Sequence, residues 1–415
     1  MAITRTEVRE IAAVSQYSSM TPFDETLKTR RVLKQRLVRC ASEARWPAGR
    51  LAKGSFVRGH LGLRDNGLQH HYSASEHRTD GATVGPTKLV LFDGMPGVGK
   101  SSLAQVLAGH LQANDIPTTW HYEEDCEHPL YPFHDSTSLQ DVLTLLDTGH
   151  HEQVIGDVLR RWQQLAKAIA ETDQVVLLDG CLYGFLTWTL FAFDVDLGVI
   201  HAYIAAVEAA IAPLQPFLVY LRPDDVEAAM RRVCDRRGGA TEQAFIARAT
   251  QSAYGQRQEL TGFLGLVRYW TDFRAFTDTL FQRTHTSKLL VNNTAAAWGE
   301  YEMALLAALS LSAATPPQVP AAQLVGLTGA FAGRAEGGEQ WCEIRLEGKQ
   351  LYLENLAGLW SHSRLLPISA THFAVESVPF ALTFERTGDE PATAFTLTGP
   401  RLLAGSVTGQ FLRAS

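Results

Sequence analysis

A glycine-rich stretch followed by a lysine and a serine is the part of this sequence best suited to chemistry. Residues 94–101 read Gly-Met-Pro-Gly-Val-Gly-Lys-Ser, which fits G-x-x-x-x-G-K-[ST] without a departure. Glycines let the backbone curl so that several N–H groups point inward, and a following helix N-terminus adds partial positive charge. Phosphate oxygens suit such a cradle. Lys100 would then reach the β- and γ-phosphates of a nucleotide, and the Ser101 hydroxyl would ligate Mg²⁺.

The segments on both sides of this Walker A pattern have the context that it needs. Residues 89–92 form an apolar run of strand length, and residues 102–111 carry apolar positions on one helical face. A glycine-rich structural turn without a ligand is the alternative interpretation. The residues expected to contact the nucleotide are Gly94, Met95, Pro96, Gly97, Val98, Gly99, Lys100, Ser101 and Ser102.

Asp179 is the predicted second metal ligand. It ends the segment Gln174-Val-Val-Leu-Leu-Asp, in which four apolar residues precede an acid as in a Walker B segment. We expect Asp179 to hold Mg²⁺ through water at the end of a strand that neighbours the first one. The alternative is that Asp179 caps a helix that begins near Cys181.

Two adjacent acids are the candidates for activating an acceptor. The second predicted strand, 118–122, runs into Glu123-Glu124-Asp125, and we expect it to lie beside the first strand with these acids at the carboxyl edge of the sheet. Glu123 or Glu124 would accept the proton of an attacking hydroxyl, or orient that hydroxyl for in-line transfer. Three successive acids are also common in a solvated turn.

An arginine-rich helix follows the fourth predicted strand and ends in Gly238-Gly239. Arg232 and Arg236 are four residues apart, so they share a helical face and are expected to neutralise charge on a transferred phosphoryl group. Whether Arg231 and Arg237 face the phosphates instead stays open, and a solvated arginine face is a further alternative. The glycine pair suits the hinge of a lid.

The chain resembles the deoxynucleoside kinase and thymidylate kinase superfamily over residues 87–310. The likeness rests on the phrase Phe92-Asp-Gly-Met-Pro-Gly-Val-Gly-Lys-Ser and on residues 216–238, where a strand ending in Leu-Arg leads to an arginine-rich lid. It implies that Glu123 or Glu124 is the hydroxyl-activating acid and that Asp179 is the acid after the third strand. The family usually has Arg next, whereas this chain has Gly180, so a divergent acceptor is implied.

Aromatic residues surround the acidic turn. Tyr131 and Phe133 follow it in a loop where a flat acceptor could stack on them, and packing of the loop onto the core is the alternative. A metal site at His128, His134 and Asp135 is a further alternative, although those residues lack the fixed spacing of a helical site.

Four regions are predicted. Residues 87–311 alternate apolar runs with helical patterns, which predicts a three-layer α/β domain with five parallel strands at 88–92, 118–122, 174–179, 216–221 and 288–291. The proline-containing stretch 312–321 is a linker. Residues 322–415 carry short strand patterns typical of a small all-β barrel or sandwich, with Trp341, Trp360 and Phe373 as its expected core. The phrases Leu324-Val-Gly-Leu-Thr-Gly-Ala-Phe, Leu351-Tyr-Leu-Glu and Leu365-Leu-Pro-Ile-Ser in this last region weakly resemble the small lipocalin-like domain behind serine β-lactamase-like proteins.

The basic segment 1–86 precedes these regions. It holds 14 Lys and Arg against 8 Asp and Glu, with a short helix predicted over 26–44. A flexible extension, an over-extended start of the reading frame and a binding arm for an acidic partner are the three interpretations.

Composition narrows the functional classes. A formal charge of −7 argues against general binding to nucleic-acid polymers or anionic membranes. Five separated cysteines without a C-x-x-C pair indicate a reducing, cytoplasmic setting, and the apolar stretch 198–213 is short for a membrane span.

We therefore expect an ATP- and Mg²⁺-dependent phosphotransferase that acts on a small hydroxylated or phosphorylated acceptor, a nucleoside or nucleotide by preference. A homodimer is compatible with the sequence. The alternatives are an ATPase switch and a nucleotide-binding scaffold that signals through its flanks. A hydrolytic motor would normally need a second acid after Asp179, and Gly180 is not one.

Overall fold

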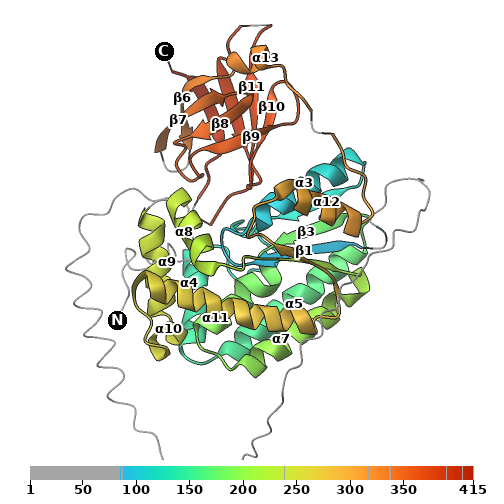
Figure 1. The fold of residues 1–415 in the computed structure, drawn as a ribbon, viewed down its shortest axis with the longest axis vertical. Coiled ribbons are helices and arrows are strands. Elements are labelled where there is room, and N and C mark those ends of the chain that lie inside the picture. The colour runs from blue at the N-terminus through green and yellow to red at the C-terminus, as the bar shows by residue number, and fades with distance from the viewer. Residues whose placement is uncertain are drawn as a thin grey trace, which may run out of the picture. The chain divides into compact units, whose positions relative to one another are not determined.

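The computed structural model describes Gly85 and residues 87–414, except positions 238, 316, 336–337, 389 and 404. The basic segment 1–86, with the helix predicted over 26–44, lies outside the described residues apart from Gly85. The described residues form a domain with a parallel sheet and a closed antiparallel barrel (Figure 1).

The sheet has the five strands that the apolar runs predict, with ends that differ by at most two residues. They are β1 (Leu89–Gly94), β2 (Thr118–His121), β3 (Val175–Asp179), β4 (Phe217–Arg222) and β5 (Ser287–Asn292). All neighbouring pairs are parallel. Helical connections supply the crossovers that parallel pairing requires.

The order of the strands corrects one prediction. The sheet runs β2-β3-β1-β4-β5, so the strands beside β1 are β3 and β4, and the expectation that the second strand would lie there is wrong. Every residue of β3 is buried, whereas each residue of β2 is only partly buried, which suits β2 to the sheet edge. Phe92 of β1 pairs in register with Asp179 of β3.

Helices cover both faces of the sheet. Figure 1 shows α3 and α12 on one face and α5, α7 and α11 on the other. The helices of this domain are α3 (Lys100–Ala113), α4 (Ser136–Asp147), α5 (His151–Ala170), the π-helix η1 (Cys181–Phe185), α6 (Leu186–Ala192), α7 (Leu197–Ile211), the 3₁₀ turn η2 (Ala212–Leu214), α8 (Val226–Arg237), α9 (Gly239–Gln251), α10 (Ala253–Arg257), α11 (Gly262–Arg283) and α12 (Trp298–Ala308). This is the predicted three-layer α/β architecture.

One helical segment, Leu197–Leu214, is long and apolar enough to cross a membrane by length and composition alone. It includes His201 and Glu208, and a third of it is buried. Ile200, Val207 and Ile211 of α7 pack into the core of the α/β domain. The segment is therefore weak evidence for a membrane role.

The C-terminal region is a closed barrel rather than a sandwich. After the short helix α13 (Ala321–Val325), its strands are β6 (Gly329–Ala335), β7 (Gly338–Glu347), β8 (Gln350–Glu354), β9 (Ser363–Pro367), β10 (His372–Val375), β11 (Ala381–Glu385), β12 (Ala394–Thr398) and β13 (Gly409–Arg413). They close in the order β10-β11-β12-β13-β6-β7-β8-β9. Phenylalanines fill the interior, among them Phe331, Phe373, Phe395 and Phe411.

The predicted core of the barrel is only partly correct. Phe373 is 1% exposed, but Trp341 is 48% exposed. On β7 the neighbouring Cys342 and Ile344 are the buried residues, so strand alternation turns Trp341 outward. Trp360 lies in the loop between β8 and β9 and contacts arginines of α8.

Candidate functional site

The loop between β1 and α3, residues 94–99 (the glycine loop), has the left-handed backbone that its sequence predicts. Gly94, Gly97 and Gly99 have φ values of 146°, 74° and 92°. Gly97 also meets α8, because a Cβ at that position would lie 2.8 Å from Cβ of Val233 on that helix. The glycine loop is therefore curled and packed against α8.

Lys100 begins α3 and is 6% exposed. Its Nζ lies 3.4 Å from Oε2 of Glu123 and donates to the carbonyl oxygen of Met95 at 3.5 Å. Burial alone would lower the pKa of Lys100, but the carboxylates of Glu123 and Asp179 outweigh that effect and raise it. Lys100 is therefore a charged donor at the carboxyl end of the sheet.

Asp179 is fully buried at the end of β3, and both of its carboxylate oxygens lack a hydrogen-bond partner among the described residues. Burial and the charge of Glu123 raise its pKa well above the usual value. The charge of Lys100 and the proximity of the Ser101 hydroxyl, which falls short of a regular hydrogen bond, favour the ionised form. Buried carboxylates are normally satisfied, so an orphaned one needs an explanation. A divalent cation held by Asp179 and Ser101 fits this donor set, since Mg²⁺ prefers oxygen ligands.

The alternative role for Asp179, a helix cap, is wrong. Gly180 is the N-cap of η1, and the Asp179 carboxylate accepts no hydrogen bond from this helix. Asp93 takes that part from the adjacent strand: it accepts hydrogen bonds from the backbone N–H groups of Leu182, Tyr183 and Gly184 at 3.1, 2.9 and 3.0 Å. Burial raises the pKa of Asp93 to about 6.

Sequence reasoning missed the role of Asp93. The one available signal was an acid at the end of a buried apolar strand, immediately before Gly94. Because Asp93 ties the start of η1 to β1, it fixes the turn that follows Asp179. It is a positioning residue of the site.

Local crowding explains why position 180 is a glycine. Its φ is 66°, and a Cβ there would lie 2.4 Å from Oε2 of Glu123 and 3.3 Å from Cε of Lys100. A larger side chain at this position would occupy the space of the Lys100–Glu123 pair. The glycine at position 180 is therefore required by the ion pair.

Of the two candidate acids, Glu123 is the one that contacts Lys100. The backbone of Glu124 accepts from the N–H of Leu403 in the C-terminal region at 2.9 Å, and the N–H of Cys126 donates to Arg401 at 3.0 Å. Tyr122, 2% exposed, belongs to the hydrophobic cluster of the barrel. The turn 123–126 is therefore anchored rather than freely solvated.

The arginines of α8 point in different directions. Arg231 pairs with Glu227 at 2.7 Å and lies over the ring of Phe263 on α11. Arg236 and Arg237 lie over the ring of Trp360, with Cζ 5.1 and 4.3 Å from its centroid. Arg232 is exposed. The convergence of Arg232 and Arg236 on one anion stays a prediction.

The aromatic loop after the acidic turn packs onto the core. Tyr131 and Phe133 are each 6% exposed and stack on one another, and the Tyr131 hydroxyl donates to the carbonyl of Glu123. His128 is buried against the thiol of Cys181 at 3.3 Å, and burial lowers its pKa to about 3. Asp135 caps α4. Packing thus occupies Tyr131, Phe133 and His128, whereas His134 stays 81% exposed, 3.7 Å from Asp135.

No protein-family model matches this chain, and no curated protein matches it. The family resemblance therefore stays a prediction. The groups at this site that could carry a function are the curled glycine loop, Lys100, Glu123 and the orphaned carboxylate of Asp179.

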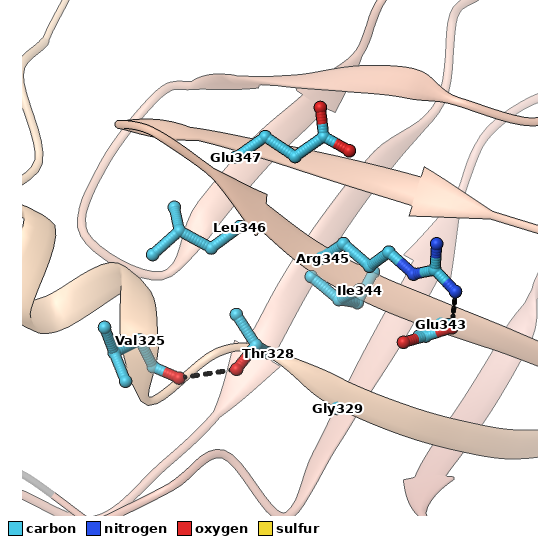
Figure 2. A pocket seen from close by; sticks show the side chains of 8 residues that line it. All are labelled: Val325, Thr328, Gly329, Glu343, Ile344, Arg345, Leu346 and Glu347. Carbon is cyan, nitrogen blue, oxygen red and sulfur yellow. Dashed lines mark hydrogen bonds and ion pairs between the residues drawn. The ribbon is translucent and has the colours of Figure 1, made fainter.

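The barrel holds two further groups of polar residues, a pocket and a cluster of acids with a histidine. Figure 2 shows a pocket on the barrel in which Glu343 pairs with Arg345 and Thr328 donates to the carbonyl of Val325, both at 2.8 Å. These polar groups already have partners, Glu347 lies 3.9 Å from His362, and the remaining lining side chains, such as that of Val325, are mostly apolar. We assign this pocket no role.

The second place is a cluster of Glu347, Glu354 and His362. Nδ1 of His362 lies 2.7 Å from Glu354, while Nε2 of the same ring lies 3.9 Å from Glu347, so the two carboxylates sit at opposite ring nitrogens. Glu354 also accepts from the Ser361 hydroxyl at 2.6 Å. These hydrogen bonds stabilise a turn of the barrel, and that structural role accounts for the cluster.

Proposed function

We propose that this protein is an Mg²⁺-dependent phosphotransferase that moves the γ-phosphoryl group of ATP to a hydroxyl or phosphate of a small acceptor, a nucleoside or nucleotide by preference. The observation that carries the proposal is the orphaned carboxylate of Asp179, buried beside Lys100 and Glu123 at the end of β3. Burying an unpaired carboxylate costs free energy, and a bound cation would offset that cost.

The ion pair between Lys100 and Glu123 supports a specific sequence of events. A triphosphate in the glycine loop would offer Lys100 a more highly charged partner than Glu123, because charge-assisted bonds to phosphate are strong. As Lys100 turned to the phosphates, Glu123 would lose its cation and become free to accept the proton of the acceptor hydroxyl. Nucleotide binding would thus prepare the base.

The remaining roles follow from position. Inward-pointing N–H groups of the glycine loop and of the first turn of α3 would hold the phosphates. Mg²⁺, when bound by Ser101 and Asp179, would neutralise charge on the phosphate oxygens. Arg232 and Arg236 would stabilise the charge of the moving phosphoryl group. Asp93 and Gly180 would keep the end of β3 in place.

A cytoplasmic location is part of this proposal. The four described cysteines Cys126, Cys181, Cys234 and Cys342 are all buried and free, which is compatible with a reducing compartment. ATP is the expected phosphoryl donor there.

The deciding experiment is a transfer assay. The purified protein, with ATP and Mg²⁺, is incubated with pooled nucleosides, nucleotides, sugars and other hydroxylated metabolites, and products are identified by mass spectrometry. We expect a phosphorylated acceptor that is absent without Mg²⁺. Phosphate release that no acceptor stimulates would favour an ATPase switch. Nucleotide binding without any turnover would favour a scaffold, and either result would overturn the proposal.

A further inference from the structure

The last turn of the lid helix α8 is bound by the barrel. Arg237 lies over the ring of Trp360 at 4.3 Å and Arg236 at 5.1 Å, which are cation–π distances. Nη2 of Arg236 also lies 3.9 Å from Glu376, in the turn between β10 and β11. Both arginines thus use groups that belong to the C-terminal region.

The same turn holds the helix that follows the glycine loop. Gln105 on α3 donates to the carbonyls of Val375 and Val378 at 2.8 and 3.2 Å, and its amide oxygen accepts from the N–H of Ser377 at 2.8 Å. The hydroxyls of Ser102 and Ser377 are 2.7 Å apart. Ser377 is 3% exposed, whereas Ser102 and Gln105 are partly buried, so these hydrogen bonds are partly shielded from water.

Arg236 and Arg237 therefore lie between two possible partners, the barrel and a phosphate bound in the glycine loop. Val233 packs against Gly97 of the glycine loop, and Arg236 and Arg237 lie three and four residues further along the same helical face. A phosphate in the loop would therefore be close to the end of α8. The glycine loop and α8 both belong to the compact unit that includes the barrel.

The grip of Glu376 on Arg236 is weak. Glu376 is engaged mainly by Arg364, which binds one of its oxygens through both Nε and Nη2. Arg236 is at 3.9 Å and its side chain remains 46% exposed. Burial of part of its surface and the nearby charges of Arg237 and Arg364 lower the pKa of Arg236, while Glu376 acts in the opposite direction. A phosphate would be a better partner.

We propose that the barrel restrains the lid: Trp360 and Glu376 hold Arg236 and Arg237, and a triphosphate bound in the glycine loop must withdraw them from the barrel. Hydrogen bonds between Gln105 and Ser377 fix the turn between β10 and β11 to α3. Because α3 follows the glycine loop, the barrel is held next to that loop. This inference rests on the proposed function. Since binding couplings are reciprocal, weakening the barrel contact should tighten triphosphate binding.

The test compares the full-length protein with Trp360→Ala and Glu376→Gln. Affinity for a nonhydrolysable ATP analogue with Mg²⁺ is measured by calorimetry, and hydrogen exchange is followed over residues 226–237 without nucleotide. We expect Trp360→Ala to bind the analogue about three- to tenfold more tightly, because the cation–π contacts are lost. Glu376→Gln should act in the same direction but only about two- to threefold, since its ion pair with Arg236 is long and partly exposed. Exchange in α8 should become faster.

Trp341→Ala is the matched control, because this tryptophan is exposed on β7 of the same barrel. It should change neither measurement. Trp360→Leu keeps apolar volume while removing the ring face, and it should act in the same direction if Trp360→Ala folds poorly. Affinity that is unchanged or weaker in Trp360→Leu and Glu376→Gln, with a parent that binds, would overturn the restraint. A parent that binds no nucleotide would overturn the proposed function, and this inference with it.

Discussion

Nζ of Lys100 lies 3.4 Å from Oε2 of Glu123, although the two residues follow strands that are not neighbours in the sheet. Strand β3 runs between β1 and β2, and Gly180 at its end leaves the space in which the two side chains meet. This ion pair is the link between the expected phosphate-binding and proton-accepting groups. Substitutions at Lys100, Glu123 and Gly180 would show what each residue contributes to it.

Replacing Lys100 by alanine should remove the main cation of the glycine loop. The loss of a charge-assisted bond to phosphate weakens binding of the ATP analogue by about 1.5–3 kcal/mol, and transfer should fall at least about a hundredfold. Calorimetry and the transfer assay measure the two effects. Lys167→Ala, on the exposed face of α5, should leave both unchanged. A Lys100→Ala variant as fast as the parent would contradict the proposed site.

Glu123→Gln should separate the two candidate acids. If Glu123 accepts the proton of the acceptor, this nearly isosteric change lowers kcat by about 10²–10⁴-fold. Affinity for the ATP analogue should be the same or higher, because Lys100 loses its competing carboxylate. Glu124→Gln is the matched control and should retain kcat within a few-fold. Equal losses in both variants would mean that the structure does not distinguish the two acids.

Gly180→Ala should disturb the ion pair through its added methyl group. A Cβ there would meet Glu123 at 2.4 Å, and φ is 66°, so we expect a loss of about 1–3 kcal/mol in the free energy of unfolding and weaker nucleotide binding. Gly149→Ala has the same backbone problem, with φ 81°, but nothing within 4 Å of its Cβ. Urea titration and calorimetry of both variants isolate the crowding of Glu123. Identical behaviour of the two would argue against it.

Asp179→Asn should have two opposite effects. Without metal, it removes an orphaned carboxylate that burial disfavours, so the free energy of unfolding should stay equal or rise by about 1–3 kcal/mol. With Mg²⁺ and the ATP analogue, the parent should gain thermal stability and the variant should not. Melting curves with and without Mg²⁺ check both effects. A variant that Mg²⁺ stabilises as strongly as the parent would remove Asp179 from the metal site.

Asp93 predicts a pH dependence of stability. Its pKa rises from 3.8 to about 6 through burial, so the folded state favours the protonated acid. Its contribution to the free energy of unfolding is therefore complete below pH 3.8 and lost as the pH rises through about 6, on the order of 2–3 kcal/mol in all.

Asp93→Asn, which stays neutral, should lack that loss. The difference in unfolding free energy between parent and variant, measured by denaturant titration from pH 4 to pH 7, should shift by this amount in favour of the variant. A difference that is constant over this range would show that Asp93 keeps an ordinary pKa. Activity enters neither measurement.

Several features of the site could be predicted because they depend on neighbours in the chain. The glycine spacing before Lys100 predicts the curled loop, and the apolar run ending in Asp179 predicts a buried strand that pairs with β1. By contrast, the role of Asp93 depends on three N–H groups about ninety residues away. The outward position of Trp341 depends on which face of β7 closes the barrel.

By itself, the sequence determined the local structures: five strands, the helices between them, the glycine loop and a β-rich C-terminal region. Periodicity and glycine placement specify these because they act over a few residues. Only the tertiary structure decided that β3 separates β1 from β2, that Glu123 faces Lys100 across Gly180, and that Trp360 holds the end of α8. Such contacts join distant segments, and only the packing of the whole chain brings them together.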